Sequence, residues 1–320
     1  MAKLEAVDSV VVWVRDQAKA REFYTRILGL KVVDDMPEGG WLTVAPQGKG
    51  SQLALLAPDP GRPDYEAAKA QIGAHTGLGF ECGDLKATLE LLQARGVGIT
   101  WASLDPNAAG GLHATIEDQD GNTMMLFQPT TKARGKGGLE RLSFINVVVR
   151  DLRAAQAFYT GSLGLAAGEE IANMSWVEVR AGKGDAGLGL LAPVEEMYEE
   201  PADYEEDLRH LGEHTGITFL TRNAAAVFTE LRSRGVQFTL EPALQPWGLV
   251  YGEFRDPDGN TFGVMQQPVH AKPAKAKPAK AKPRAAPKKA KPAKKTPARG
   301  KPAKAKPKAA KRVAAKRKKR

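Results

Sequence analysis

The 320-residue sequence contains a long internal repeat, which constrains its fold more than any other feature. Residues 10–30 (VVVWVRDQAKAREFYTRILGL) and 146–165 (NVVVRDLRAAQAFYTGSLGL) share an Asp, a Phe-Tyr pair and a Leu-Gly-Leu run at a constant offset of 135 residues. Residues 75–77 (HTG) recur at 214–216, and the Gly-Asn pair at 121–122 recurs at 259–260. Repeated sequences fold into repeated units, so we expect two similar halves.

The repeat sets the expected domain boundaries. We predict a first domain over residues 1–130, a Gly/Lys-rich linker over 131–138 and a second domain over 139–268. Residues 269–320 form a separate Lys/Pro/Ala-rich tail.

Each copy shows the same order of secondary structure twice, a β-α-β-β-β unit. Asp16 and Asp84 precede apolar-periodic segments and are suited to cap helices, while Gly29 and Gly96 follow them at positions that favour a left-handed residue. The segments DQDGN and DPDGN supply turn residues between the last two strands of each copy. We therefore predict an α+β fold of two tandem domains, each of paired β-α-β-β-β units that form a cupped mixed sheet, with helices on the other side.

The charge is divided sharply between body and tail. Residues 1–270 carry 24 Lys and Arg against 37 Asp and Glu, whereas residues 271–320 carry 23 Lys and Arg and no acidic residue. Cys82 is the only cysteine, so no intrachain disulfide forms, and the start of the chain lacks the pattern of a signal peptide. We expect a cytoplasmic, nucleoid-associated protein with no membrane partner.

The repeated motifs resemble those of the vicinal oxygen chelate superfamily, which includes glyoxalase I, extradiol dioxygenases and bleomycin-resistance proteins. The resemblance rests on a strand ending in Val-Arg-Asp, on AxxFYxxxLGL, on a later helix ending in Arg-Gly-Val, and on FRDPDGN at 254–260, and it covers about residues 4–268. It implies the fold, but one fold hosts many activities.

The resemblance also implies where metal ligands would stand. The family pattern places them at Ser9 and Phe144, at Gly77 and Gly216, at Met125 and Gly263, and on a fourth strand within 52–55 and 186–190. None of these positions has the imidazole or carboxylate that divalent metals require. We therefore expect no metal, no cofactor and no catalytic residue of the family's usual kind.

A relocated site is the alternative that we keep open. Two of the five histidines, His75 and His214, lie near the vacated positions, and His210 and His214 have the spacing of an i,i+4 metal pair. Glu81, Glu117 and Glu253 are strand carboxylates that would act as bases if buried. The structural interpretation is that both histidines bond the loop that enters the strand.

Strand alternation predicts which side chains face the cups. They form a largely apolar pocket for a small ligand, with the second copy the better candidate, or they fill the cups as core. The candidate pocket residues are Ser9, Val11, Trp13, Gly77, Glu81, Met125, Phe144, Asn146, Gly216, Thr218, Trp247, Tyr251 and Gly263.

The tail has the composition of a disordered polycation that resembles the tails of histone H1 and of bacterial H1-like proteins. We expect it to bind DNA or RNA without sequence specificity, through phosphate neutralisation. The predicted contacts include Lys272, Lys275, Lys277, Lys280, Lys282, Arg284, Lys288, Lys289, Lys316, Arg317, Lys318, Lys319 and Arg320.

Three functions follow from these patterns. The first is a metal-free small-molecule-binding protein tethered to nucleic acid. The second is a lyase, isomerase or dioxygenase with a non-standard metal or acid–base site. The third is a structural nucleoid-associated protein.

Overall fold

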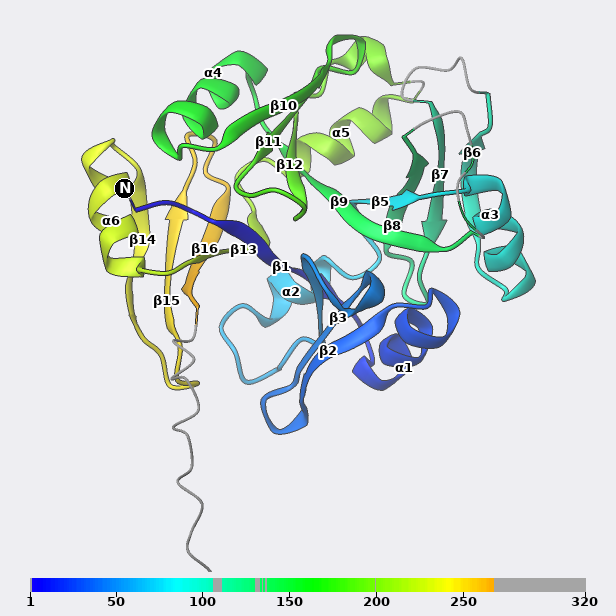
Figure 1. Cartoon of the computed structure of the whole chain (residues 1–320), viewed down its shortest axis with the longest axis horizontal. Coiled ribbons are helices and arrows are strands. Elements are labelled where there is room, and N and C mark those ends of the chain that lie inside the picture. Colours follow the sequence, from blue (N-terminus) through cyan, green and yellow to red (C-terminus); the bar gives the residue numbers. More distant parts are fainter. Residues whose placement is uncertain are drawn as a thin grey trace, which may run out of the picture. The chain divides into compact units, whose positions relative to one another are not determined.

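The alternating apolar residues of the two repeats form strands β1–β16, which lie in two eight-stranded sheets, A and B (Figure 1). The computed structural model describes residues 2–105, 111–129, 133, 135, 137–198 and 200–267. The predicted tail and much of the predicted linker lie outside the described residues.

Sheet A combines strands from the beginning and the end of the body. Its spatial order is β14 (Gln237–Leu244), β15 (Val250–Arg255), β16 (Thr261–Gln266), β13 (His214–Thr221), β1 (Ala6–Trp13), β4 (Gln52–Leu56), β3 (Trp41–Ala45) and β2 (Lys31–Met36).

Sheet B combines the strands of the middle of the body. Its spatial order is β10 (Ala166–Ile171), β11 (Trp176–Arg180), β12 (Gly187–Leu191), β9 (Leu139–Val148), β5 (His75–Cys82), β8 (Thr123–Gln128), β7 (Leu112–Glu117) and β6 (Ile99–Ser103).

The sheets therefore do not follow the repeats, although the α+β class is as predicted. In sheet A the first half of one repeat joins the second half of the other through the antiparallel pair β1–β13, and β9–β5 is the same junction in sheet B. The expectation of one cup per copy is corrected on this point. Each β-α-β-β-β unit leaves its first strand at an edge, and pairing two such edges satisfies their backbone groups.

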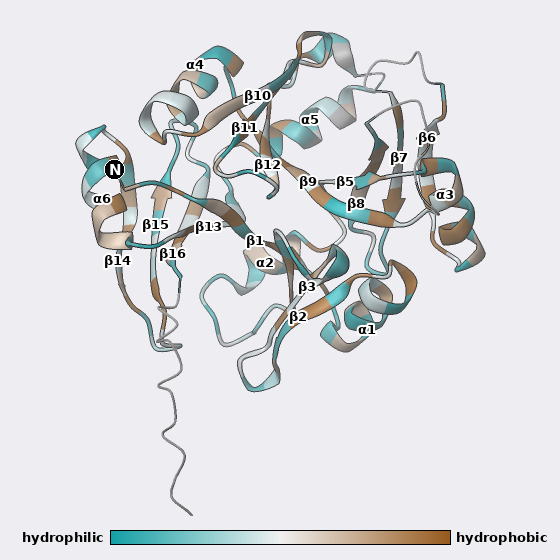
Figure 2. Ribbon diagram, viewed as in Figure 1, coloured by the Kyte–Doolittle hydropathy of each residue, from teal (hydrophilic) through white to brown (hydrophobic). Residues whose placement is uncertain are grey.

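Helices cover one face of each sheet. α1 (Gln17–Glu22) and α6 (Ala224–Ser233) pack against sheet A, and α3 (Leu85–Ala94) and α4 (Leu152–Ala157) pack against sheet B. α2 (Tyr65–Ala70) and α5 (Pro201–Arg209) precede β5 and β13. Brown and teal alternate along many of these elements in Figure 2, as expected for one buried face.

The predicted helix caps are present. The Asp16 carboxylate accepts hydrogen bonds from the backbone amides of Ala18 and Lys19, and Asp84 accepts from that of Ala87. α1 and α4 each continue into a π-helical turn, at Phe23–Ile27 and Phe158–Ser162. Among the described residues, no helix combines the length and the apolar character needed to cross a bilayer.

The single thiol is part of the core. Cys82 is fully buried at the end of β5, and burial raises the pKa of its thiol to about 12. A thiol with so high a pKa is almost entirely protonated at neutral pH, so it is a poor nucleophile.

The Asp-x-Asp-Gly-Asn turns connect distant segments as well as reversing the chain. Asp256 accepts hydrogen bonds from the buried Tyr159 hydroxyl at 2.8 Å and from the Asn260 side chain at 2.8 Å, and Asn260 also donates to the Val148 carbonyl. Burial is the main cause that raises the pKa of both Asp256 and Tyr159. Tyr24, Asp118, Asn122 and Trp13 form the same network in the other copy.

Replacing Tyr159 by Phe should therefore destabilise the protein. The change removes one donor from a buried carboxylate, and we expect a loss of about 1–3 kcal/mol in the free energy of unfolding, measured by urea denaturation. Tyr24→Phe should lose a similar amount, whereas Tyr65→Phe on the outer helix α2 should change stability by less than about 0.5 kcal/mol. Equal stability of Tyr159→Phe and wild type would show that the hydroxyl contributes nothing.

The junction between β1 and β13 contains a bulge at Asp8. The register shifts between Val7 and Ser9, which leaves Asp8 as the extra residue. Burial raises the pKa of Asp8 to about 6, and the nearby carboxylates of Asp34 and Asp185 act in the same direction, against a hydrogen bond with Ser9. Folding therefore favours the protonated form of Asp8.

This residue should make stability depend on pH. The stabilisation that Asp8 contributes to the folded state is fully present below the ordinary Asp pKa of about 3.9. It is lost as the pH rises through about 6, the pKa of Asp8 in the folded protein. Asp8→Asn, a neutral isostere, should therefore raise the free energy of unfolding at pH 7 by about 1–3 kcal/mol and have little effect at pH 4.

Asp34→Asn is the matched control, because it removes a neighbouring charge and should lower the Asp8 pKa only in part. Chemical denaturation at both pH values measures these differences. A destabilised Asp8→Asn variant at pH 7 would contradict this account of the bulge.

Candidate functional site

Strand alternation divides the side chains of β1 between two faces. Val10 and Val12 lie in the core with Phe23 and Tyr24, whereas Ser9, Val11 and Trp13 point to the opposite side. We call this opposite side the inner face of sheet A, and we call the equivalent side of sheet B its inner face.

Strand register aligns one row of inner-face positions across each sheet. In sheet A the row is Gln52, Ser9, Thr218, Gly263 and Glu253. In sheet B it is Gly187, Phe144, Gly79, Met125 and Thr115. The first row is mainly polar and the second mainly apolar. Register also identifies the fourth-strand positions that the sequence left open, Gln52 and Gly187.

Aromatic rings fill the inner face of sheet B. A Cβ at Gly79 would overlap the Phe144 ring, so the ring lies directly against this glycine. The Phe144 ring centroid is 5.5 Å from that of Phe127 and 5.5 Å from that of Trp176. Aromatic contacts of this kind are favourable beyond their buried area. The half-buried Phe144 ring thus covers Gly79 and packs between two aromatic neighbours.

Asn146 belongs to the same packed cluster. Its Oδ1 accepts a hydrogen bond from Trp176 Nε1 at 2.9 Å, and a side chain at Gly189 would collide with both partners. The amide therefore orients an indole ring that itself packs on Phe144.

A hydrogen-bonded carboxylate lies on the inner face of sheet A. Glu253 Oε1 accepts from the Tyr251 hydroxyl at 3.0 Å and lies 3.4 Å from His214 Nε2. His214 Nδ1 in turn accepts from the Gly216 backbone amide at 3.3 Å, which is consistent with the proton on Nε2. The hydrogen bond from His214 is the largest influence on the pKa of Glu253 and lowers it. Burial raises this pKa, and the hydrogen bond from Tyr251 lowers it further.

Tyr251 also occupies the space beside Gly263. A Cβ at Gly263 would lie 2.7 Å from the Tyr251 hydroxyl and 2.8 Å from Thr218 Oγ1. Burial raises the pKa of Tyr251 above its ordinary value, followed by the charge of Glu253, so the phenol remains a donor at neutral pH. Trp247, predicted as a pocket wall, is 61% exposed and contacts Tyr251 with ring centroids 6.1 Å apart.

Gln52 has a buried oxygen without a partner. Among the described residues, Gln52 Oε1 is the one buried side-chain nitrogen or oxygen that has no hydrogen-bond partner. It lies in register with Ser9, which is itself 3% exposed. A buried acceptor of this kind costs about 1–3 kcal/mol unless something donates to it.

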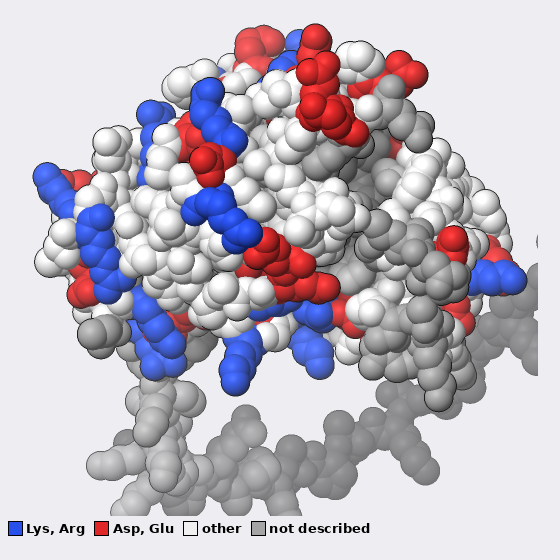
Figure 3. All heavy atoms as spheres, turned by 90° about the horizontal axis from the view of Figure 1, so that it is seen from above, with Lys and Arg blue, Asp and Glu red and all other residues white. Residues whose placement is uncertain are grey.

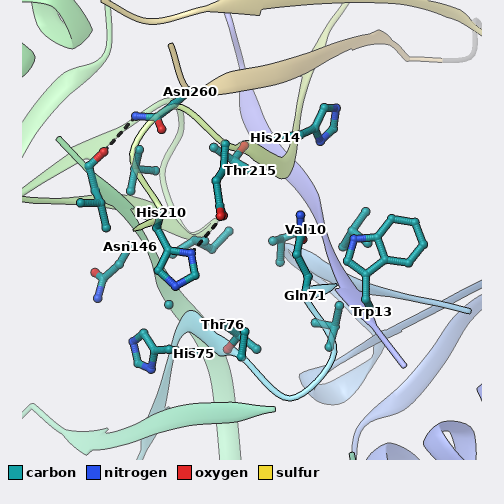
Figure 4. Close-up of a pocket in the computed structure, with 18 of the residues that line it drawn as sticks. Val10, Trp13, Gln71, His75, Thr76, Asn146, His210, His214, Thr215 and Asn260 are labelled. Carbon is teal, nitrogen blue, oxygen red and sulfur yellow. Dashed lines mark hydrogen bonds and ion pairs between the residues drawn. The ribbon is translucent and has the colours of Figure 1, made fainter. Parts of the chain in front are cut away.

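A cavity of about 100 Å³ lies where the two inner faces meet (Figure 4). Equivalent residues of both repeats line it in pairs, such as His75 with His214 and Asn122 with Asn260. Trp13 reaches it from sheet A and Asn146 from sheet B. The residues that line it do not include those of the two inner-face rows.

The structure separates the predicted pocket residues into two groups. The group on or beside sheet A is Ser9, Val11, Trp13, Gly216, Thr218, Trp247, Tyr251 and Gly263, and the group on sheet B is Gly77, Glu81, Met125, Phe144 and Asn146. The second copy thus does not hold one pocket of its own, because Asn146 and Thr218 belong to different sheets. Glu81 forms an ion pair with Arg141 at 2.6 Å.

The histidines have mainly local partners. His75 Nδ1 is 3.0 Å from Thr123 Oγ1 at the start of β8, whereas the sequence interpretation expected a bond to the loop that enters β5. His210 follows the last residue of α5, and its Nδ1 is 3.0 Å from Glu213. His214 begins β13, so the two histidines do not share a helix face. His113 packs against Trp101 with ring centroids 4.7 Å apart. Sequence reasoning missed the Tyr251–Glu253–His214 network.

The residues at the family's ligand positions do not fit a divalent metal. On sheet A, Ser9 offers one hydroxyl and Gln52 one amide oxygen, and on sheet B these positions offer no oxygen or nitrogen donor. Gly77 and Gly216 adopt φ of +67° and pack against Asn146 and Val11. In the described part of the chain, no group of three or more His, Cys, Asp or Glu side chains is placed to hold a metal ion.

Comparison with known proteins agrees with this fold. The uncharacterized protein YetH of Bacillus subtilis (strain 168) is 32% identical over 127 residues, which is 38% of this chain and 98% of YetH. The crystal structure of glyoxalase I from Zea mays has a TM-score of 0.56 at 17% identity, over 82% of this chain and 92% of the maize chain.

A putative dioxygenase from Bacillus subtilis subsp. subtilis str. 168 has a TM-score of 0.58 at 14% identity, over 84% of this chain and 87% of that chain. At these identities the two structures show the fold alone. The sequence model of the Glyoxalase/Bleomycin resistance protein/Dioxygenase superfamily matches residues 6–126 and 141–264. The chain therefore belongs to the Glyoxalase/Bleomycin resistance protein/Dioxygenase superfamily, with two tandem copies of its domain.

Proposed function

We propose that this protein binds a small molecule on the inner face of sheet A without a metal, and binds nucleic acid through its tail. The observation that carries the first part is Gln52 Oε1, a buried acceptor in a row of polar side chains. Ligand sites combine apolar walls with a few oriented polar groups of this type.

The contrast between the two sheets supports one site per chain. The same backbone positions hold Ser9 and Thr218 in sheet A but Phe144 and Gly79 in sheet B, where the Phe144 ring covers the glycine. The proposed site therefore uses residues of both repeats and occurs once.

Acid–base catalysis near His214 has weaker support. Both nitrogens of its imidazole have partners, Glu253 and the Gly216 amide. The lowered pKa of Glu253 makes its carboxylate a weak base at neutral pH. The network is better suited to hold a fixed charge than to move a proton.

Binding of a small molecule is testable on the full-length protein. We expect a thermal-shift screen of a chemically diverse library to give ligands that bind with a stoichiometry of one per chain by calorimetry. Gln52→Leu, which removes the acceptor and keeps an apolar side chain, should weaken such a ligand by about tenfold, since a hydrogen bond contributes roughly 1.4 kcal/mol or more at a buried site.

The matched control is Thr115→Val in the equivalent row of sheet B, which should leave affinity unchanged. Metal content should be measured on the same preparation. A stoichiometric bound metal, or a ligand whose affinity is insensitive to Gln52, would contradict the proposal.

Nucleic acid binding is proposed from composition. Residues 271–320 carry 23 basic and no acidic residues, whereas residues 1–270 have a net charge of −13. On the face of the described body seen in Figure 3, side chains of both signs are scattered over the surface. A phosphate backbone would thus be attracted to the tail and repelled by the body as a whole.

The proposed binding of nucleic acid by the tail predicts that the affinity depends steeply on salt concentration. If the tail neutralises about 6–10 phosphates, the affinity for duplex DNA of any sequence should fall by about 10³–10⁵ between 50 and 200 mM salt, as measured by fluorescence anisotropy. A chain that ends at residue 267 should lose this binding. Full affinity of that truncated chain would assign DNA binding to the body instead.

A further inference from the structure

We infer that the turn between β14 and β15 (residues 245–249) stacks on the unpaired bases of a single-stranded nucleic acid. This inference rests on the proposed binding of nucleic acid by the tail, and it adds a contact on the body and a preference for single strands. It follows from an exposed aromatic ring, an uncharged segment and the place where the chain leaves sheet A.

The β14–β15 turn and its flank are unusually apolar for a surface. Leu244 is 71% exposed and Trp247 is 61% exposed, the two highest values for large hydrophobic side chains in the described part of the chain. Residues 242–252 (PALQPWGLVYG) contain no charged side chain. Neighbouring apolar groups that remain in water often mark a surface that contacts another molecule.

The ring of Trp247 is held in place without being covered. Two backbone hydrogen bonds of 2.9 Å close the turn, from the Gln245 amide to the Leu249 carbonyl and from the Gly248 amide to the Gln245 carbonyl. The indole meets the Tyr251 ring edge to face, with an interplanar angle of 63°. Trp247 does not line the central cavity. A fixed and open aromatic ring is the kind of surface on which nucleic acid bases stack.

The chain leaves sheet A beside this turn. Tyr251 lies opposite Met265 in the antiparallel pair β15–β16, and the Gln267 amide donates to a carbonyl of β13 at 2.8 Å, so β16 ends next to the turn (Figure 1). Lys272, the first basic residue of the tail, follows Gln267 by five residues. Five residues span at most about 18 Å. Phosphates neutralised near Lys272 would therefore be held close to the turn.

An exposed guanidinium lies on the other side of β16. Thr221 ends β13 in register with Gln266, and Arg222 follows it directly. The Arg222 side chain is 81% exposed, and its Nε is 3.1 Å from Glu5. An exposed ion pair of this kind is weak, so a phosphate can compete with Glu5 for the guanidinium. This end of sheet A thus offers a ring for bases and a cation for the backbone.

The separation of charge and aromatic character favours a single strand as the occupant. Residues 271–320 contain no aromatic residue, so any stacking on bases has to come from the body. In a duplex the bases are already stacked and paired, and reaching them costs unstacking energy. The tail alone would therefore bind a duplex, whereas the tail and Trp247 together would bind a single strand.

Two labelled probes test this preference on the full-length protein by fluorescence anisotropy at one salt concentration: oligo(dT) of about 20 nucleotides and a duplex of about 20 base pairs. Trp247→Ala should weaken the binding of oligo(dT) by about 5- to 100-fold and change the affinity for the duplex by less than about twofold. Trp101→Ala is the matched control, because Trp101 is 51% exposed but lies on β6 of sheet B. It should leave both affinities unchanged.

Trp247→Phe separates stacking from folding, because it keeps an aromatic ring. It should retain most of the affinity for oligo(dT), but it should lose the quenching of tryptophan fluorescence that oligo(dT) causes in the wild-type protein. This comparison remains decisive if Trp247→Ala does not fold.

An unchanged affinity of Trp247→Ala for oligo(dT), an equal loss for both probes or an equal effect of Trp101→Ala would overturn the stacking assignment. Sedimentation of the wild type as a dimer and of Trp247→Ala as a monomer would also overturn it, since the turn would then join two copies of the chain. Binding by the tail is judged separately, by the salt dependence of duplex binding and its loss in the chain that ends at residue 267.

Discussion

The rest of the structure depends on the antiparallel pairing of β1 with β13 and of β9 with β5. Each pair joins the edge strand of one β-α-β-β-β unit to the edge strand of a unit from the other repeat. The backbone groups of both edges are satisfied, and neither sheet retains an open strand at its centre. As a result, each of the two rows combines residues of both repeats. Across the junction, Thr218 follows Ser9 by 209 residues in sheet A, and Phe144 follows Gly79 by 65 residues in sheet B. Neither repeat alone contains a complete row.

This exchange lets two similar sequences produce two different faces. The backbone geometry of the rows is equivalent, but Phe144 with Gly79 fills one face and Ser9 with Thr218 leaves the other polar. A glycine opposite an aromatic ring allows the ring to lie flat against the strand, and the neighbouring rings of Phe127 and Trp176 hold it there. The two faces therefore differ in what occupies equivalent positions. Half-buried aromatic rings cover one face, and hydrogen-bonding groups line the other.

Much of the local structure was predictable from the sequence. The caps at Asp16 and Asp84, the left-handed glycines at 29 and 96 and the Gly-Asn turns all follow from short-range rules, and all are present. The partner of each edge strand was not predictable, because pairing within a repeat and pairing between repeats satisfy the same alternation of apolar residues. That one ambiguity explains why Asn146 and Thr218 were assigned to a common pocket.

The same ambiguity in strand pairing prevented prediction of the hydrogen bonds that join Tyr251, Glu253 and His214. Tyr251 and Glu253 are two residues apart on one strand, so alternation alone places them on one face. Their connection to His214 requires knowledge that β13, β16 and β15 are neighbours in that order. Similarly, Gln52 becomes recognisable as the fourth-strand position only from its register with Ser9.

The charge distribution links the two proposed activities. A polycationic tail would hold the body close to a phosphate backbone, although the body's own net charge of −13 is repelled by that backbone. High salt would release the tail from the phosphates and would weaken the repulsion of the body at the same time.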